Sequence, residues 1–342
     1  MRMISSDVSG VLQSRLSAFV KWIRTEPERE EDIRERAANI RKAIRSRAIE
    51  EGLVVRSTPN AGSFATRTGL RRHMRGESEV EGRDVDLPFV VAPRAKNDER
   101  LDTLLPRFEG YARAAYPDTR RESVKSSVKL LFTDKVNFDL VPLLATQHPE
   151  RQILIRTDGE RRETSIERHI EFVSTRTERS KRTAFAVNFN DLVRLLKWWR
   201  CCRQATSSTI KEVPSFLVTL LSAHAFDCRG VQVGYAETLA DWFGLLGHVV
   251  RKRVSIAFGD YAAIPKPTNG NAWAVHDPVN AGNNLVEKWS GVMCDELAEW
   301  LEESRDALYD AIAAFDDERE IDGIERLVCV FGNAIRYHSE NS

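Results

Sequence analysis

The sequence of 342 residues lacks several features that define large classes of protein. It contains no run of eighteen or more apolar residues, so we expect no transmembrane helix. The N-terminus shows no basic segment followed by an apolar one, and we therefore expect no secretion signal. The chain carries 51 basic and 51 acidic residues. Because proteins that bind long nucleic acids usually have a basic excess, this balance argues against such a partner.

Cysteine is also scarce. The chain has five cysteines, an odd number, and no two of them are spaced as Cys-x-x-Cys. We therefore expect no disulfide framework, and a reducing cytoplasm fits best. The adjacent Cys201 and Cys202 could belong to a zinc site, but no nearby histidine completes a ligand set. We interpret them as thiols near the end of a buried helix.

The hydrophobic pattern changes its period along the chain. Residues 7–51 have apolar residues at helical spacing, interrupted at Thr25-Glu26-Pro27, where proline can begin a new helix. A helix is expected at 99–116, and strands are expected at 84–91, 127–132 and 136–141. From residue 164 the pattern is helical, with helices expected at 164–179, 189–203, 214–227, 234–253, 284–303 and 319–337.

These patterns predict an α+β fold with two lobes. Residues 1–160 would form a long N-terminal helical segment and a lobe built on a mixed sheet. Residues 161–342 would form a helical lobe, in which the Gly/Pro/Asn-rich stretch 265–284 is a loop.

Two acidic residues lie close together on the first expected strand. Side chains on a strand alternate between its faces, so Asp84 and Asp86 project to the same side. Two neighbouring carboxylates repel each other unless a cation lies between them, and magnesium prefers carboxylate, phosphate and water oxygens. The pair is therefore half of a possible magnesium site. The alternative is a solvated start of a strand.

A third acidic residue, Asp139, lies within the apolar run Phe138–Pro142. A carboxylate with apolar neighbours on both sides is costly unless something pairs with it. If a neighbouring strand carries Asp84 and Asp86, three carboxylates surround one site, and two metal ions about 4 Å apart could be held there for phosphoryl transfer. The alternative is an ion pair between Asp139 and an arginine elsewhere.

Gly62 and Ser63 precede the acidic residues by about twenty positions. Glycine permits close approach of the backbone, and a serine hydroxyl with free N–H groups at a helix start can hold phosphate groups. The alternative is an ordinary turn.

Together, Gly62-Ser63, Asp84-x-Asp86 and Asp139 resemble the signature of the DNA polymerase beta-like nucleotidyltransferases. The narrower likeness is to the oligoadenylate synthetase and cyclic GMP–AMP synthase branch, which includes the bacterial CD-NTases. The run Phe138–Pro142 resembles the FDLVP strand of that branch. Further similar stretches, over roughly residues 50–290, are Lys197-Trp198-Trp199, Val213–Leu217 and Asp277–Asn284, a DP-x-x-P-x-NN loop with Ala281 in place of the usual proline.

The resemblance implies a two-lobed fold and a role for each matching residue. Asp84 and Asp86 would ligate two Mg²⁺ or Mn²⁺ ions, and Asp139 would ligate the ion that activates the attacking ribose hydroxyl. The donor triphosphate would be held by Gly62, Ser63, Lys197 and Ser215, while Phe216 would stack on a base.

The residue types of the helical lobe leave other roles open. Lys197 could reach solvent along its apolar neighbours instead of pairing with a triphosphate. Ser215 follows Pro214 at a helix start and could cap that helix. Phe216 could be part of the core rather than a platform for a nucleobase.

The resemblance further implies that ATP and GTP are the substrates and that the product is a cyclic dinucleotide, with a cyclic GMP–AMP among the candidates, or a related cyclic oligonucleotide. Such a second messenger would act in antiphage signalling through a downstream effector protein, without a membrane or a long nucleic acid. The alternatives are a nucleotidyltransferase that modifies RNA or tRNA, and a catalytically silent nucleotide-binding protein.

Overall fold

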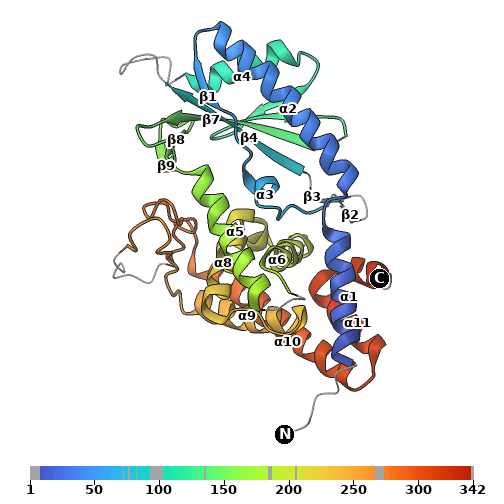
Figure 1. Ribbon diagram of the computed structural model, residues 1–342. Coiled ribbons are helices and arrows are strands. Elements are labelled where there is room, and N and C mark those ends of the chain that lie inside the picture. Colours follow the sequence, from blue (N-terminus) through green and yellow to red (C-terminus); the bar gives the residue numbers. More distant parts are fainter. Residues whose placement is uncertain are drawn as a thin grey trace. The chain divides into compact units, whose positions relative to one another are not determined.

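The computed structural model describes residues 8–339, except 72, 76, 77, 82, 93–102, 135, 184–186, 205 and 266–272. The chain divides into two compact units (Figure 1). The sheet unit consists of Thr25–Phe172, and the helical unit consists of Met1–Arg24 together with Val173–Ser342. The first helix therefore groups with the C-terminal part of the chain, whereas we had expected residues 1–160 to stay together.

The sheet unit is built on a mixed sheet that has seven strands in the described part of the chain. Its strands are β1 (Val54–Ser57), β4 (Arg83–Ala92), β5 (Arg120–Ser123), β6 (Val128–Leu131), β7 (Val136–Ala145), β8 (Gln152–Ile155) and β9 (Arg161–Thr164). The main order is β1-β4-β7-β6-β5, and β8 joins β7 to β9. The central strands β4 and β7 run parallel, and the other pairs are antiparallel. A separate hairpin contains β2 (His73–Arg75) and β3 (Ser78–Glu81).

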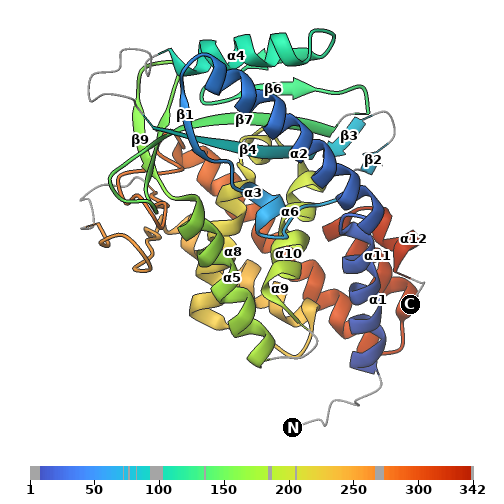
Figure 2. The ribbon, with the colours of Figure 1, turned by 45° about the horizontal axis from the view of Figure 1, so that its top comes forward.

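Two helices, α2 (Pro27–Glu50) and α4 (Leu104–Ala115), cover one face of this sheet (Figures 1 and 2). Their apolar residues form one core with alternate residues of the central strands, such as Val85 and Leu87 on β4 and Phe138 on β7. Because side chains alternate along a strand, the residues between these, including Asp84, Asp86 and Asp139, project from the opposite face. The short helix α3 (Gly62–Ala65) lies on that second face (Figure 1).

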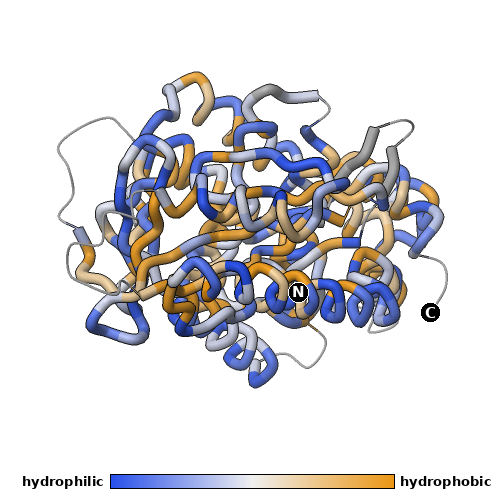
Figure 3. The backbone as a smooth tube through the Cα atoms, turned by 90° about the horizontal axis from the view of Figure 1, so that it is seen from above, coloured by the Kyte–Doolittle hydropathy of each residue, from blue (hydrophilic) through white to orange (hydrophobic). Residues whose placement is uncertain are grey.

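The helical unit packs around large aromatic side chains. Phe19 of the first helix lies with its ring centroid 5.6 Å from Trp198 and 5.8 Å from Phe331. The helices of this unit are α1 (Val8–Ile23), α6 (Phe189–Arg203), α7 (Ser208–Lys211), α8 (Ser215–Arg229), α9 (Tyr235–Arg251), α10 (Gly291–Asp316), α11 (Glu320–Phe331) and α12 (Ala334–His338). Most of α5 (Ile166–Thr183) also belongs to it, although α5 begins in the sheet unit. Hydrophobic and hydrophilic residues are interspersed along the backbone (Figure 3). Among the described residues, no helix is long and apolar enough to cross a membrane.

Most expected helices are present, with two corrections. The break near Pro27 is confirmed, since α1 ends at Ile23 and α2 begins at Pro27. The helix expected at 284–303 begins later, at Gly291, because the side chain of Ser290 caps it, and it continues to Asp316. The helix expected at 319–337 is divided in two, because Gly332 adopts a φ of 72° and ends α11.

Candidate active site

The two central strands align the predicted carboxylates. In the parallel pairing of β4 with β7, Asp86 lies opposite Asp139 and Asp84 lies opposite Asn137. Residues in register on neighbouring strands project to the same side of a sheet. All three carboxylates therefore gather on the face that α2 and α4 leave open. In the part of the chain that the structure describes, the cationic side chain that contacts Asp139 is that of Lys129, not an arginine.

Gly62 lies directly against this face. A Cβ atom added at Gly62 would lie 1.9 Å from Oδ2 of Asp86, which is far inside van der Waals contact. The backbone φ of Gly62 is 61°, a conformation that side chains other than glycine rarely adopt. Both the close approach and the turn therefore require glycine. The following residue, Ser63, is half-buried in the first turn of α3.

A lysine that we did not predict lies among the carboxylates. The Nζ atom of Lys129 is 2.8 Å from Oδ2 of Asp84 and 3.7 Å from Oδ2 of Asp139. The second oxygen of each carboxylate also has a donor: Asn137 donates to Asp84 at 3.2 Å, and the hydroxyl of Ser127 donates to Asp139 at 3.3 Å. The alternation in Ser127-Val128-Lys129-Leu130 indicates that Ser127 and Lys129 share a face, but the strand register that brings them to Asp139 is not visible in the sequence.

Burial and charge act against each other at these residues. The side chain of Asp139 is 13% exposed, whereas that of Asp84 is 48% exposed. Burial raises the pKa of Asp139, although the neighbouring Lys129 partly opposes this. For Lys129, burial alone would lower the pKa, but the hydrogen bond with Asp84 and the charge of Asp139 outweigh it and the pKa is raised. The site is thus an anionic cluster that contains the ammonium group of Lys129.

The donor set fits a hard divalent cation that also binds phosphate. Within the described residues, no group of three or more His, Cys, Asp or Glu side chains is placed so that it could hold a metal ion by itself. Magnesium in proteins is usually held by one or two carboxylates together with substrate phosphates and water, rather than by protein ligands alone. Oxygen donors from aspartates on one sheet face, without sulfur or imidazole, suit Mg²⁺ or Mn²⁺.

The other predicted residues belong to the helical unit. Lys197 on α6 is only 4% exposed, so the expectation that it could reach solvent is wrong. Ser215 does not cap α8, because Pro214 occupies the N-cap position without a side-chain bond and Ser215 is already the first helical residue. Phe216 follows it and is half-buried.

The loop at Asp277–Asn284 is organised by its own polar residues. Asp277 is 6% exposed, and its carboxylate accepts hydrogen bonds from the backbone of Val279 at 2.9 Å and the side chain of Asn283 at 3.2 Å. The side-chain oxygen of Asn284 accepts from the backbone N–H groups of Val275 and Val286. The side chains of Asp277, Asn283 and Asn284 therefore stabilise the conformation of this loop through hydrogen bonds within it and to the residues that flank it.

The two adjacent cysteines lie where we expected. Cys201 is buried and Cys202 is partly buried near the end of α6, and the thiol of Cys202 donates to the backbone oxygen of Phe331. All five cysteines are free thiols.

Comparisons with known proteins identify a matching domain and similar folds. A family model described as Second Messenger Oligonucleotide or Dinucleotide Synthetase domain matches residues 11–176. The fold is similar to that of E. coli MS115-1 CdnC with ATP, at 24% identity and a TM-score of 0.75 over 94% of this chain and 98% of that one. It is also similar to the Bradyrhizobium diazoefficiens CD-NTase CdnG in complex with GTP, at 16% identity and a TM-score of 0.70 over 98% of each chain.

A third similar structure is Vibrio cholerae DncV cyclic AMP-GMP synthase, at 15% identity and a TM-score of 0.59 over 96% of this chain and 86% of that one. No curated protein sequence matches the chain. The predicted α+β, polymerase beta-like fold is confirmed by these structural likenesses. The chain therefore contains a stretch, residues 11–176, that matches the Second Messenger Oligonucleotide or Dinucleotide Synthetase domain, and its fold is similar to that of the CD-NTase structures named above.

Proposed function

We propose that this chain joins ATP and GTP into a cyclic dinucleotide, with a cyclic GMP–AMP as one candidate, or into a related cyclic oligonucleotide. The observation that carries the proposal is the gathering of Asp84, Asp86 and Asp139 on one sheet face, with Gly62 packed against Asp86. This arrangement occurs in a chain whose matched domain is a second messenger synthetase. The structures of similar fold that contain ATP or GTP support these substrates.

The chemistry assigned to the carboxylates is phosphoryl transfer. Family members are metal-dependent nucleotidyltransferases, and bound Mg²⁺ or Mn²⁺ would supply neutralisation of the charge on the reacting phosphate. Asp84 and Asp86 would hold both ions, and Asp139 would hold the one nearer the attacking ribose hydroxyl and take part in removing its proton. A new ester bond forms at the α-phosphorus, the bond to the β-phosphate breaks, and pyrophosphate leaves.

The remaining predicted residues would bind the donor nucleotide. Gly62 would bring the backbone N–H groups at the start of α3 close to the phosphate oxygens, and Ser63 would add a hydroxyl. Lys197 would supply a positive charge to the triphosphate, Ser215 a hydroxyl, and Phe216 an aromatic face to a base. Catalysis of this kind depends on positioning and charge neutralisation.

A direct assay tests this function. Purified protein is incubated with labelled ATP, GTP, CTP and UTP and with Mg²⁺ or Mn²⁺, then treated with phosphatase and chromatographed. We expect a phosphatase-resistant product that incorporates label from both ATP and GTP. Product that appears only when RNA or tRNA is added would instead indicate an RNA-modifying enzyme. Binding of a non-hydrolysable triphosphate without any product would indicate a catalytically silent protein.

The cellular role follows from the product class. A cyclic oligonucleotide made in the cytoplasm would act in antiphage signalling by binding a downstream effector protein. The balance of 51 basic and 51 acidic residues supports activity without a long nucleic acid. Infection of cells that carry the active gene or an Asp86→Asn copy would show whether phage resistance depends on synthesis.

Replacement of Gly62 by alanine tests the close approach to Asp86. The added Cβ would lie 1.9 Å from Oδ2 of Asp86 and would force that carboxylate to move. A displacement of about 1 Å at reacting groups can lower a rate by about 10²-fold, and the positive φ costs roughly 1–3 kcal/mol of stability. We expect both losses, measured by product formation and by thermal denaturation.

The matched control is Gly110→Ala on α4. Nothing lies within 4 Å of a Cβ atom added there, and Gly110 is exposed. Because alanine favours a helix over glycine by about 0.5–1 kcal/mol, this variant should be slightly more stable and fully active. If Gly62→Ala keeps more than a third of the wild-type rate, Gly62 does not hold Asp86 in its working position.

A further inference from the structure

The ammonium group of Lys129 lies between two of the three carboxylates of the candidate active site. It is 2.8 Å from Asp84 and 3.7 Å from Asp139. The position follows from the sheet: Lys129 on β6 is in register with Asp139 on β7, which is in register with Asp86 on β4. The lysine side chain is 20% exposed, so its charge is only partly screened by water.

This lysine completes a set of donors around the carboxylates. Asn137 and Ser127 donate to the oxygens of Asp84 and Asp139 that Lys129 does not contact. All four oxygen atoms of these two aspartates therefore have a donor within 3.7 Å. A divalent cation that binds Asp84 and Asp139 together must displace the ammonium group or tolerate a positive charge next to it, and like charges at this separation repel strongly.

We propose that Lys129 is an internal counter-ion that keeps divalent cations from binding Asp84 and Asp139 until a nucleoside triphosphate is present. The inference rests on the function proposed above. The triphosphate changes the balance in two ways: its oxygens complete the coordination of the ion, and its negative charges attract the ammonium group away from the aspartates. Metal and nucleotide then favour each other's binding, because a coupling of this kind is reciprocal.

The role of Lys129 is therefore to hold Asp84 and Asp139 in place and to exclude divalent cations from them. Without it, Asp84 and Asp139 would repel each other, and a metal ion alone would relieve that repulsion. A positive charge 4–6 Å from a carboxylate changes its proton affinity by about 10- to 1000-fold, and the affinity for another cation should change in the same direction. Removal of the lysine charge should thus strengthen metal binding to the free enzyme by at least about tenfold.

The test measures binding of Mn²⁺ alone to the full-length protein by electron paramagnetic resonance, without any nucleotide. We expect Lys129→Met and Lys129→Gln to bind Mn²⁺ at least about tenfold more tightly than the wild type. Lys129→Arg keeps the charge and should stay close to the wild type. Lys125→Met is the matched control, since Lys125 is an exposed lysine between β5 and β6 in the same unit. This variant should bind Mn²⁺ with the affinity of the wild type.

A second titration adds a non-hydrolysable ATP analogue, and the difference between Lys129→Met and the wild type should then shrink to less than about threefold, because the triphosphate supplies its own charge. Thermal denaturation gives an independent readout: Mn²⁺ alone should raise the melting temperature of Lys129→Met and Lys129→Gln more than that of the wild type. Circular dichroism checks that each variant is folded.

Two outcomes overturn the proposal in distinguishable ways. If the wild type binds Mn²⁺ with the analogue but both neutral variants bind free Mn²⁺ no better than the wild type, Lys129 does not exclude metal, and the proposed function stands. If the wild type binds no Mn²⁺ even with the analogue, the metal site itself is misassigned and both proposals fail.

Discussion

The variant Asp86→Asn is expected to form product at least about 10³-fold more slowly than the wild type. Asp86 lies in register with Asp139 and against Gly62, at the centre of the anionic face. Asparagine has nearly the same size but no charge, so it cannot balance two divalent ions. Metal ions contribute several kcal/mol of charge stabilisation to phosphoryl transfer, and each 1.4 kcal/mol is about a factor of ten in rate.

The fold should survive this change, because Asp86 is only partly buried and projects away from the core that α2 and α4 cover. Initial rates with labelled ATP and GTP, together with melting temperatures, measure both expectations. Asp118→Asn serves as the control, since Asp118 is an exposed residue between α4 and β5. A rate for Asp86→Asn within tenfold of the wild type would remove Asp86 from the reaction.

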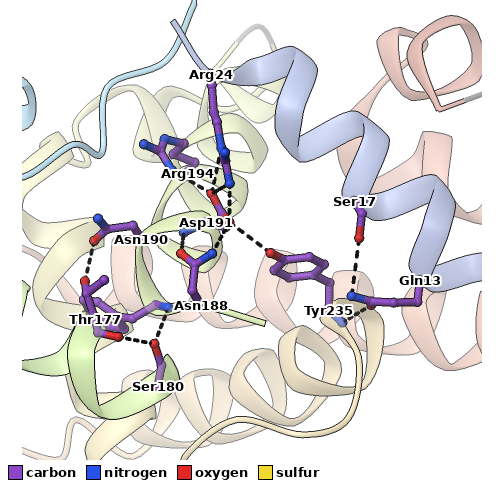
Figure 4. Close-up of polar contacts among 11 residues, drawn as sticks. Gln13, Ser17, Arg24, Thr177, Ser180, Asn188, Asn190, Asp191, Arg194 and Tyr235 are labelled. Atoms are coloured by element: carbon purple, nitrogen blue, oxygen red, sulfur yellow. Dashed lines mark hydrogen bonds and ion pairs between the residues drawn. The ribbon is translucent and has the colours of Figure 1, made fainter. Parts of the chain in front are cut away.

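The second large effect is expected far from the chemistry, at a buried carboxylate of the helical unit. Asp191 on α6 is 0% exposed and accepts hydrogen bonds from Arg24 at 2.7 Å, Arg194 at 2.6 Å and the hydroxyl of Tyr235 at 3.0 Å (Figure 4). These partners come from α6, from α9 and from the residue that follows α1. Burial and the charge of Asp191 both raise the pKa of Tyr235, so this hydroxyl stays protonated and donates.

Asp191→Ala should lower the free energy of unfolding by about 3–5 kcal/mol, because it removes the buried carboxylate that forms an ion pair with the mostly buried Arg194. Chemical denaturation followed by circular dichroism measures the loss. Asp306→Ala is the control: the side chain of Asp306 on α10 is 64% exposed and pairs only at the surface, so the expected change is below about 0.5 kcal/mol.

The milder variant Asp191→Asn keeps the shape of the side chain and should lose less stability than Asp191→Ala. A loss below about 1 kcal/mol for Asp191→Ala would mean that the network around Asp191 is not needed to hold α1, α6 and α9 together. Such a result would leave the candidate active site untouched, since none of its acidic residues belongs to the helical unit.

Local patterns in the chain were enough to predict much of the fold. The helix at 189–203 and the break before Pro27 are confirmed, because amphipathic spacing and proline act over a few neighbouring residues. Alternation along a strand likewise placed Asp84 and Asp86 on one face. The order of Gly62-Ser63, the acidic pair and Asp139 was sufficient to indicate the nucleotidyltransferase family, which the matched domain supports.

Other features depend on contacts between distant segments and carry little local signal. The short strands β1, β5, β8 and β9 have four residues each, and three of them show at most one buried residue, so no hydrophobic period marks them. Register between strands brings Lys129, Ser127 and Asn137 to the carboxylates, and no local pattern specifies it. The grouping of α1 with the C-terminal helices likewise arises from packing between segments more than a hundred residues apart, such as Phe19 against Trp198 and Phe331, and only the tertiary structure determines it.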